Sequence, residues 1–322
     1  MNIFNLLPWV RKKFNVIKGI DIDNSFLLFL RNEFEEFIEG MFEDPFWFRE
    51  EGKLDMFAGT IDEPVEELKK LLKKHAVKKK EALYPSSFDW RCVGENQDNY
   101  ISKRVEWQGM CSSCTAFGTI AVMEAAARIE KNISENSALA KSLPYLSEAQ
   151  LFFCSEGEKS KIGWYVSEAV KYCMNNGVAP YEYFPWNYQP PWDYDEQKCD
   201  LKTGWQNKIT KISSYHNIYE PKEMKEWISE KGPLIATMNV YLDFMFYRDG
   251  VYKKGAEFWN KKIGGHCIAC IGYDDKKKAW LCKNSWSEHW GMDGYFYIGY
   301  GQCGIDQSMT AIDGFSEIYM KG

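Results

Sequence analysis

The segment Cys111-Ser112-Ser113-Cys114 places two thiols shortly before a run, residues 119–129, whose apolar residues recur at helical spacing. Cys114 is therefore expected near the N-terminus of a helix. Unpaired backbone N–H groups and the positive end of the helix dipole favour a thiolate over a thiol at such a position. A thiolate attacks carbonyl carbon, so the segment predicts a nucleophile. Taken alone, it fits a structural cysteine in a disulfide or zinc site equally well.

A nucleophilic cysteine needs a base for its proton, a residue that orients the base, and donors for the oxyanion. His266 follows a Gly-Gly pair and is predicted to begin an apolar strand, which would aim its imidazole out of the end of a sheet. Asn284 lies on the next predicted strand, where its side-chain carbonyl is expected to accept the N–H of His266 and fix the tautomer. Gln108, shortly before Cys114, offers an amide N–H for the oxyanion.

Together these segments resemble the papain-like cysteine proteases. The resemblance rests on Gln-Gly-x-Cys-x-Ser-Cys before an Ala-Phe helix, Gly-Gly-His before a strand, and Asn-Ser-Trp-x-x-x-Trp-Gly. It covers residues 84 to about 315, and residues 240–266 are most similar to the cathepsin B branch. The resemblance implies a fold of two lobes and hydrolysis of peptide bonds through a thioacyl intermediate on Cys114.

The same resemblance assigns a role to each candidate residue. Cys114 would be the nucleophile, His266 the base, Asn284 the residue that orients the base, and Gln108 the oxyanion donor. Trp286 would shield the hydrogen bond between Asn284 and His266. Substrate-binding positions are implied at Gly163, Trp164, Thr237, Gly265, Cys267, Trp290 and Ser308, with the last tryptophan on the primed side of the cleft. Because the positions that shape the pocket are uncharged, modest apolar specificity is expected.

Three residues near the nucleophile depart from the family pattern. Thr115 stands where the family carries a tryptophan directly after the nucleophile, and Ser112 stands where it carries a glycine. Trp164 occupies the second position of a Gly-Gly pair that binds substrate backbone, so it is expected to narrow the unprimed side of the cleft. None of these changes removes a catalytic group. They motivate an alternative interpretation, a catalytically weak or silent relative that acts as a binding protein.

The resemblance also bears on specificity and on disulfides. The cathepsin B branch owes its exopeptidase activity to a loop with paired histidines, whereas residues 180–198 contain no histidine. An open cleft and endopeptidase action are therefore expected. A family disulfide is implied between Cys154 and Cys199, while Cys111 and Cys303 lack their usual partners.

The elements that must position these groups divide the body in two. After the Cys114 helix, residues 146–154 and 166–175 are predicted to be helical, with Ser147 as an N-cap. The second half has one predicted helix, 224–231, and short runs typical of strands at 234–240, 267–273, 279–283 and 294–298. This order predicts an α+β fold with a helical lobe at 84–205, a β-rich lobe at 206–322, and the site in the cleft between them.

Residues 1–83 differ from the body, since they hold no cysteine and mix aromatic clusters with charge runs. The segment Asp55-Met56-Phe57-Ala58, followed by an acidic helix start, is faintly similar to a short propeptide motif of the family. The resemblance thus implies a zymogen whose N-terminal segment runs through the cleft as an intramolecular inhibitor. A permanent regulatory or docking domain is the alternative.

Composition argues against other partners. A net charge of −6 disfavours nucleic acid, because phosphate binding uses a basic face. The apolar run at residues 26–30 is too short to span a bilayer, and the charges of residues 11–13 follow the apolar start instead of preceding it as in a secretory signal. We therefore expect peptide or protein substrates, no membrane segment and no cofactor. The compartment stays open, and a lysosome-like or secreted one is compatible.

Ten cysteines include two Cys-x-x-Cys pairs, Cys111 with Cys114 and Cys267 with Cys270, as in a four-cysteine zinc site. The pairs are far apart in the chain, and thiols at the second pair would point to opposite faces of a strand. We therefore predict no metal site and keep a structural zinc protein only as an alternative. Cys270 and Cys282 are expected as small apolar core residues.

Overall fold

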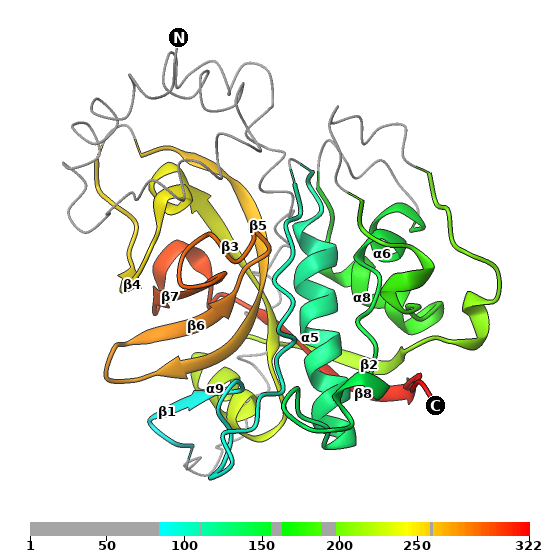
Figure 1. Cartoon of the computed structure of the whole chain (residues 1–322). Helices are drawn as coiled ribbons and strands as arrows, with labels where there is room; N and C mark the ends of the chain where they lie inside the picture. Colours follow the sequence, from blue (N-terminus) through cyan, green and yellow to red (C-terminus); the bar gives the residue numbers. More distant parts are fainter. Residues whose placement is uncertain (1–83, 110, 156–162, 188–197, 258–259) are drawn as a thin grey trace, which may run out of the picture.

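The computed structural model describes residues 84–109, 111–155, 163–187, 198–257 and 260–322 (Figure 1). In this part of the chain a group of helices packs beside a sheet, which confirms the predicted α+β class. The predictions for residues 1–83, and for residues 188–197 of the loop without histidine, lie outside the described residues.

The helices lie close to their predicted positions. They are α5 (Cys114–Lys131), α6 (Glu148–Phe153), α8 (Val166–Asn175) and α9 (Pro221–Glu230). Ser147 caps α6 as predicted, because its hydroxyl accepts the N–H of Gln150 at 2.9 Å. α9 begins earlier than predicted because proline suits the first turn of a helix. Short 3-10 helices occur at η2 (Ala140–Ser142), η3 (Tyr181–Tyr183), η5 (Trp205–Asn207), η6 (Leu242–Phe246) and η7 (Gln302–Gly304).

The sheet contains every described strand. These are β1 (Ser87–Asp89), β2 (Lys211–Ile218), β3 (Leu234–Tyr241), β4 (Val251–Tyr252), β5 (Lys262–Asp274), β6 (Ala279–Lys283), β7 (Tyr295–Gly299) and β8 (Met309–Glu317). Their order is β2-β8-β3-β5-β6-β7-β4, with β1 paired to β5. The four predicted strands correspond to β3, β5, β6 and β7, which carry the most continuous burial.

Two long strands, β2 and β8, were not predicted from the sequence. β2 carries polar residues at most positions, and β8 continues through Gly314 into exposed residues, so neither shows a clear alternation of buried and exposed positions. The two strands pair with each other and extend the sheet toward the helices (Figure 1). The first and last described segments also cross between the predicted lobes: β1 joins β5, and the N–H of Lys321 donates to the carbonyl of Ser142.

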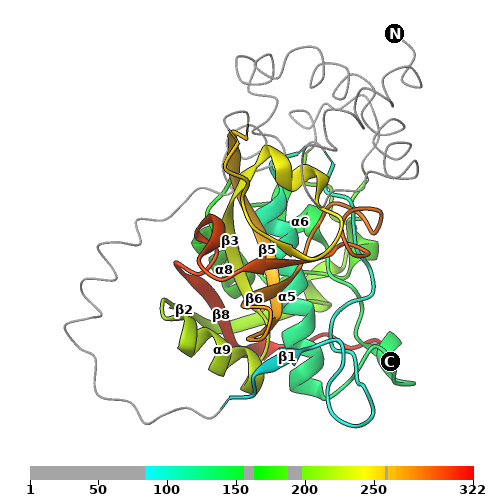
Figure 2. The ribbon, with the colours of Figure 1, turned by 90° about the vertical axis from the view of Figure 1, so that its left-hand side faces the viewer.

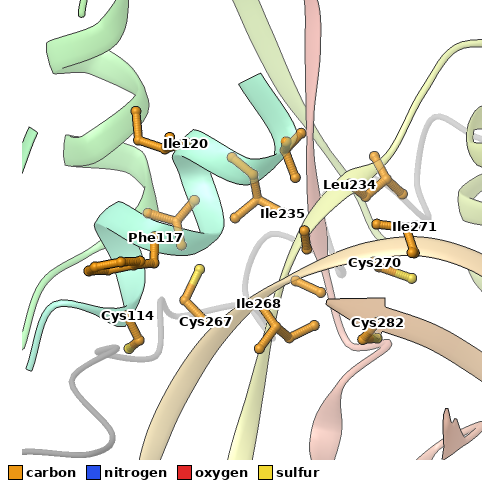
Figure 3. Close-up of a cluster of buried hydrophobic side chains, with 14 of the residues drawn as sticks. Cys114, Phe117, Ile120, Leu234, Ile235, Cys267, Ile268, Cys270, Ile271 and Cys282 are labelled. Carbon is orange, nitrogen blue, oxygen red and sulfur yellow. The ribbon is translucent and has the colours of Figure 1, made fainter. Parts of the chain in front are cut away.

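The core that positions the site lies between α5 and the sheet. Figure 2 shows α5 running behind β3 and β5. In Figure 3, Ile235 on β3 and Cys267 on β5 point toward α5, and all the labelled residues belong to the buried core. The helix that begins with the predicted nucleophile is therefore packed directly on the strand that carries His266.

Candidate active site

Cys114 is the first residue of α5, as the helical pattern predicted. Ser113 occupies the N-cap position without a side-chain capping bond, and the first turn contains no acidic residue. A carboxylate there would compete with a thiolate for the positive end of the helix dipole. The first turn of α5 is therefore suited to an anionic sulfur.

His266 lies inside a strand and not at its start, which corrects the prediction. β5 begins at Lys262, and His266 pairs opposite Met238 on β3. The preceding Gly264 and Gly265 look like a turn in sequence, yet they pair opposite Val240 and Asn239. Glycine adopts extended backbone as readily as it adopts turns, so its presence does not end a strand. The imidazole is fully buried, with an exposed fraction of 0%.

Asn284 lies within hydrogen-bond distance of the imidazole. It follows the last residue of β6, and its Oδ1 atom lies 2.7 Å from Nε2 of His266. The backbone N–H of Ser285 donates to the same Oδ1 at 2.9 Å, which identifies that atom as the amide oxygen. Nε2 must then carry the hydrogen. The ring of Trp286 lies over the imidazole with a centroid distance of 4.8 Å, and its shielding role stays a prediction.

Gln108 is held by a residue that the sequence interpretation did not single out. Ser285 donates its hydroxyl to Oε1 of Gln108 at 2.6 Å, and its carbonyl accepts the Gln108 N–H at 2.9 Å. These two bonds turn Nε2 toward the nucleophile loop, where it donates to the carbonyl of Cys111 at 2.9 Å. An amide nitrogen carries two hydrogens, so a second donor is available for an oxyanion. The position of Ser285 within the Asn-Ser-Trp motif is the sequence signal that could have identified its role in holding Gln108.

Gly118 allows α5, which begins at Cys114, to approach β5, which carries His266. A Cβ atom at this position would lie 2.7 Å from Sγ of Cys267, the residue next to His266. Glycine inside a helix costs about 1 kcal/mol relative to alanine. The close approach of α5 to β5 explains why glycine stands here, one turn after Cys114.

The predicted pocket positions on the sheet come together. Thr237 pairs opposite Cys267, and Asn239 pairs opposite Gly265. Ser308 directly precedes Met309, the partner of Ala236 on β3. Thr237, Gly265 and Ser308 are partly buried, whereas Cys267 is fully buried against α5. Their role in binding substrate stays a prediction.

The two predicted tryptophan positions lie in the buried core. Trp290 is 2% exposed, packs edge-on against Trp286 and donates its Nε1–H to the carbonyl of Met245 at 3.1 Å. Trp164 is 4% exposed. Gly163 has a φ of +81°, a left-handed conformation that favours glycine, so the chain turns immediately before Trp164.

A buried cluster of charges adjoins the catalytic residues, and the sequence interpretation missed it. It lines a small pocket formed by Arg104, Glu106, Phe117, Ala121, Glu124, Glu148, Lys283, Asn284 and Ser285. Arg104 contacts Glu148 at 2.6 Å and Glu106 at 3.1 Å. Lys283, next to Asn284, donates to the carbonyls of Ser102 and Arg104.

Burial shifts the pKa values of this cluster in opposite directions. It raises the pKa of Glu148 to about 7 despite the adjacent Arg104, and it lowers the pKa of Lys283 to about 8. Burial also disfavours the charged form of Arg104, but the carboxylates of Glu148 and Glu124 outweigh it and raise the pKa of Arg104. Glu148 therefore titrates near neutral pH.

The cysteines outside the site have separate roles. Cys154 and Cys199 form the predicted disulfide. Cys270 and Cys282 are fully buried and pair opposite each other on β5 and β6, as expected for core residues. Among the described residues there is no group of three or more His, Cys, Asp or Glu side chains able to hold a metal ion. In the same part of the chain no helix is long and apolar enough to cross a membrane.

Comparison with known proteins gives a consistent picture. A family model described as "Papain family cysteine protease" matches residues 84–312. Pro-cathepsin H of Bos taurus is 30% identical over 231 residues, which cover 69% of this chain and 62% of that protein. Cathepsin B-like CP3 of Giardia intestinalis is 31% identical over 247 residues, which cover 72% of this chain and 75% of that protein.

A solved structure, proCathepsin B S9 from Trypanosoma congolense, has a TM-score of 0.63 at 21% identity, covering 82% of this chain and 88% of that chain. This likeness shows that the fold is papain-like. Cathepsin H and cathepsin B-like relatives match at nearly equal identity, so assignment to the cathepsin B branch stays a prediction. The match spans less than two thirds of pro-cathepsin H. The match of the family model to most of the body, together with the papain-like fold, shows that the chain belongs to the papain family of cysteine proteases.

Proposed function

We propose that residues 84–322 form a cysteine endopeptidase in which Cys114 is the nucleophile and His266 the general base. The observation that carries the proposal is the hydrogen bond of 2.7 Å between His266 and Asn284, on a strand packed against the helix that begins at Cys114. Asn284 orients the base, and Gln108 supplies an oxyanion donor.

The geometry supports a specific sequence of proton transfers. Because Nε2 of His266 donates to Asn284, Nδ1 is the nitrogen that accepts the Cys114 proton, and it has no other hydrogen-bond partner in the described part of the chain. The thiolate then forms a bond to the peptide carbonyl carbon, and the carbonyl electron pair moves onto oxygen. The N–H groups of Gln108 and Cys114 stabilise that oxygen.

The same imidazole completes the reaction. When the tetrahedral intermediate collapses, the C–N bond breaks, and Nδ1–H protonates the departing amine. Nδ1 then removes a proton from the water that attacks the thioester carbonyl. The C–S bond breaks, the carboxylic acid product leaves, and Cys114 is restored as the thiolate beside the protonated imidazole. Trp286 covers the His266–Asn284 pair and keeps water from competing for that hydrogen bond.

Processing of residues 1–83 is the second element of the proposal. The body holds the chain from Pro85 onward: the hydroxyl of Tyr273 donates to the Pro85 carbonyl at 2.9 Å, and the N–H of Asp275 donates to the Ser86 carbonyl at 2.8 Å. The relatives named above as pro-cathepsins are made with a pro-segment. We infer that residues 1–83 inhibit the cleft and that cleavage occurs close to Tyr84.

A thiol-directed probe tests the catalytic proposal. The full chain, before and after activation at acidic pH, is incubated with a peptidyl epoxide, and the adduct is mapped by mass spectrometry. An adduct on Cys114 is expected, together with its loss in His266→Ala and its retention in His216→Ala, which changes an exposed imidazole paired with Asp313. Labelling of Cys114 that survives in His266→Ala, or no peptide hydrolysis by activated enzyme that has not met the epoxide, would favour a silent binding protein.

Two further measurements test the finer points. An internally quenched peptide blocked at both ends is expected to be cleaved, whereas release of dipeptides alone from a free C-terminus would show exopeptidase action. Activity is expected to rise in parallel with a fragment that begins near Tyr84. Full activity of the uncut chain would reject the inhibitory role of residues 1–83.

A further inference from the structure

Thr115, the residue directly after Cys114, bonds to a distant segment. Its Oγ1 donates to the backbone carbonyl of Trp164 at 3.1 Å, and its side chain is fully buried. A threonine inside a helix usually bonds back to the carbonyl four residues earlier. Thr115 is the second residue of α5, so that carbonyl lies outside the helix and the hydroxyl is directed across to Trp164.

The segment that receives this bond is short and held at both ends. Gly163 turns the chain with a φ of +81°, and Tyr165 is the extended N-cap residue of α8. Between them, the indole of Trp164 belongs to the buried core. The Trp164 peptide group is thus fixed through its side chain on one side and through Thr115 on the other.

We propose that Thr115 is a positioning residue for substrate binding. Its hydroxyl sets the place of the Trp164 peptide group relative to Cys114, so that an extended substrate lies along residues 163–165 when its scissile carbonyl meets the thiolate. A carbonyl oxygen has two lone pairs, so Trp164 can accept from Thr115 and still accept an N–H of a peptide. The inference rests on the proposed peptidase function. It concerns the substrate residues that precede the scissile bond.

The expected effect is set by the strength of one neutral hydrogen bond. Such a bond contributes about 0.5–1.5 kcal/mol, which corresponds to a factor of roughly 2 to 10 in a binding constant. Thr115→Val keeps the shape of the side chain and removes the donor. It is expected to raise KM by about 2- to 10-fold for a substrate with three residues before the scissile bond, with a smaller change in kcat.

The chain offers a matched control one helical turn away. Thr119 is also fully buried on α5, but its Oγ1 has no hydrogen-bond partner among the described residues. Thr119→Val therefore replaces the same hydroxyl group on the same helix without breaking a hydrogen bond. It is expected to leave KM unchanged, and Thr115→Ser, which restores the hydroxyl, is expected to recover most of the lost KM.

Steady-state kinetics on the full chain after activation provide the test. KM and kcat are measured for the three-residue amide and for an ester of a single blocked amino acid, which does not reach residues 163–165. The rate of Cys114 alkylation by iodoacetamide and the thermal midpoint are measured for each variant. The expected result is a KM increase in Thr115→Val that is confined to the longer substrate and exceeds the change in alkylation rate.

Three results would overturn the inference: an equal KM increase for both substrates, an alkylation rate that falls as much as kcat/KM, or no recovery in Thr115→Ser. Failure of the proposed function looks different. In that case the unmodified chain cleaves neither substrate, or its Cys114 alkylation is insensitive to His266→Ala. A Thr115→Val chain that does not fold is recognised by its thermal midpoint, and Thr115→Ser then decides whether a hydroxyl at this position restores KM.

Discussion

His266 and Asn284 form a hydrogen-bonded pair whose polarity is fixed by the backbone. The N–H of Ser285 donates to the same Asn284 oxygen that receives Nε2–H of His266. The Asn284 amide group therefore cannot flip its oxygen and nitrogen without losing both hydrogen bonds. Nδ1 is left as the only nitrogen of the ring able to exchange a proton with Cys114.

Asn284→Ala is expected to lower kcat/KM by about 10- to 10²-fold, because the imidazole loses its fixed tautomer and orientation. His266→Ala is expected to cost more, about 10²- to 10⁴-fold, since the base itself is removed. Steady-state kinetics with a peptide amide measure both. Asn217→Ala on β2, where the side chain accepts from Thr310, serves as the control. Equal losses in the two asparagine variants would contradict the assignment.

Ser285→Ala tests the support of the oxyanion donor. Loss of its hydroxyl frees the Gln108 amide to rotate, so kcat is expected to fall by a few-fold to about 10-fold with little change in KM. Removing the donor in Gln108→Ala is expected to cost about 10²- to 10³-fold in kcat. The matched control is Ser102→Ala, because the buried hydroxyl of Ser102 has no hydrogen-bond partner within the described residues. A KM effect without a kcat effect would argue against this role.

Glu148 makes stability depend on pH in a direction that can be measured. Its ordinary pKa of 4.5 rises to about 7 in the folded protein, so the folded state binds the proton more tightly than the unfolded state does. The contribution of this group to the free energy of unfolding therefore falls as pH rises from about 4.5 to 7, by at most on the order of 3 kcal/mol. Lys283, with a pKa near 8, stays charged through this window.

The test is urea unfolding at pH 4.5 and pH 7 in a Cys114→Ala background, which prevents self-digestion. Glu148→Gln keeps an acceptor for Arg104 and removes the titration, so its stability difference between the two pH values is expected to be smaller than in the parent. Glu182→Gln removes an exposed carboxylate paired with Lys321 and serves as the control. An unchanged pH difference in Glu148→Gln would show that burial of this carboxyl does not raise its pKa.

Substitutions that exchange a small and a large side chain at Thr115 and Trp164 are expected to compensate each other in stability. Both side chains are buried, and the Thr115 hydroxyl donates to the Trp164 backbone carbonyl. The resemblance to the family implies a tryptophan at the first position and a glycine at the second. Thr115→Trp alone overpacks the site, at a cost of about 1–3 kcal/mol, and Trp164→Gly alone leaves a cavity, at about 3–5 kcal/mol. The double variant is expected to lose less than the sum of the two. Additive losses in urea unfolding would reject the coupling.

Local sequence determined much of the helical part and pointed to the candidate catalytic residues. Ser147 predicted the start of α6, and the apolar spacing of residues 166–175 matched the bounds of α8. These features depend on neighbours a few residues away, through capping and periodic burial. Cys114, His266, Asn284 and Gln108 were recognised because their residue types and flanking motifs allow few other chemistries.

Tertiary structure decided how those residues are held. Ser285 and Gln108 are separated by 177 positions in sequence, and Thr115 and Trp164 by 49, so no local pattern records either hydrogen bond. The packing of α5 on Cys267 explains the glycine at position 118, and no local pattern records that contact. The buried charges of Arg104, Glu148 and Lys283 belong to three separate segments that only the folded chain brings into one pocket. Long-range packing sets these contacts, because burial and hydrogen-bond satisfaction are properties of the assembled core.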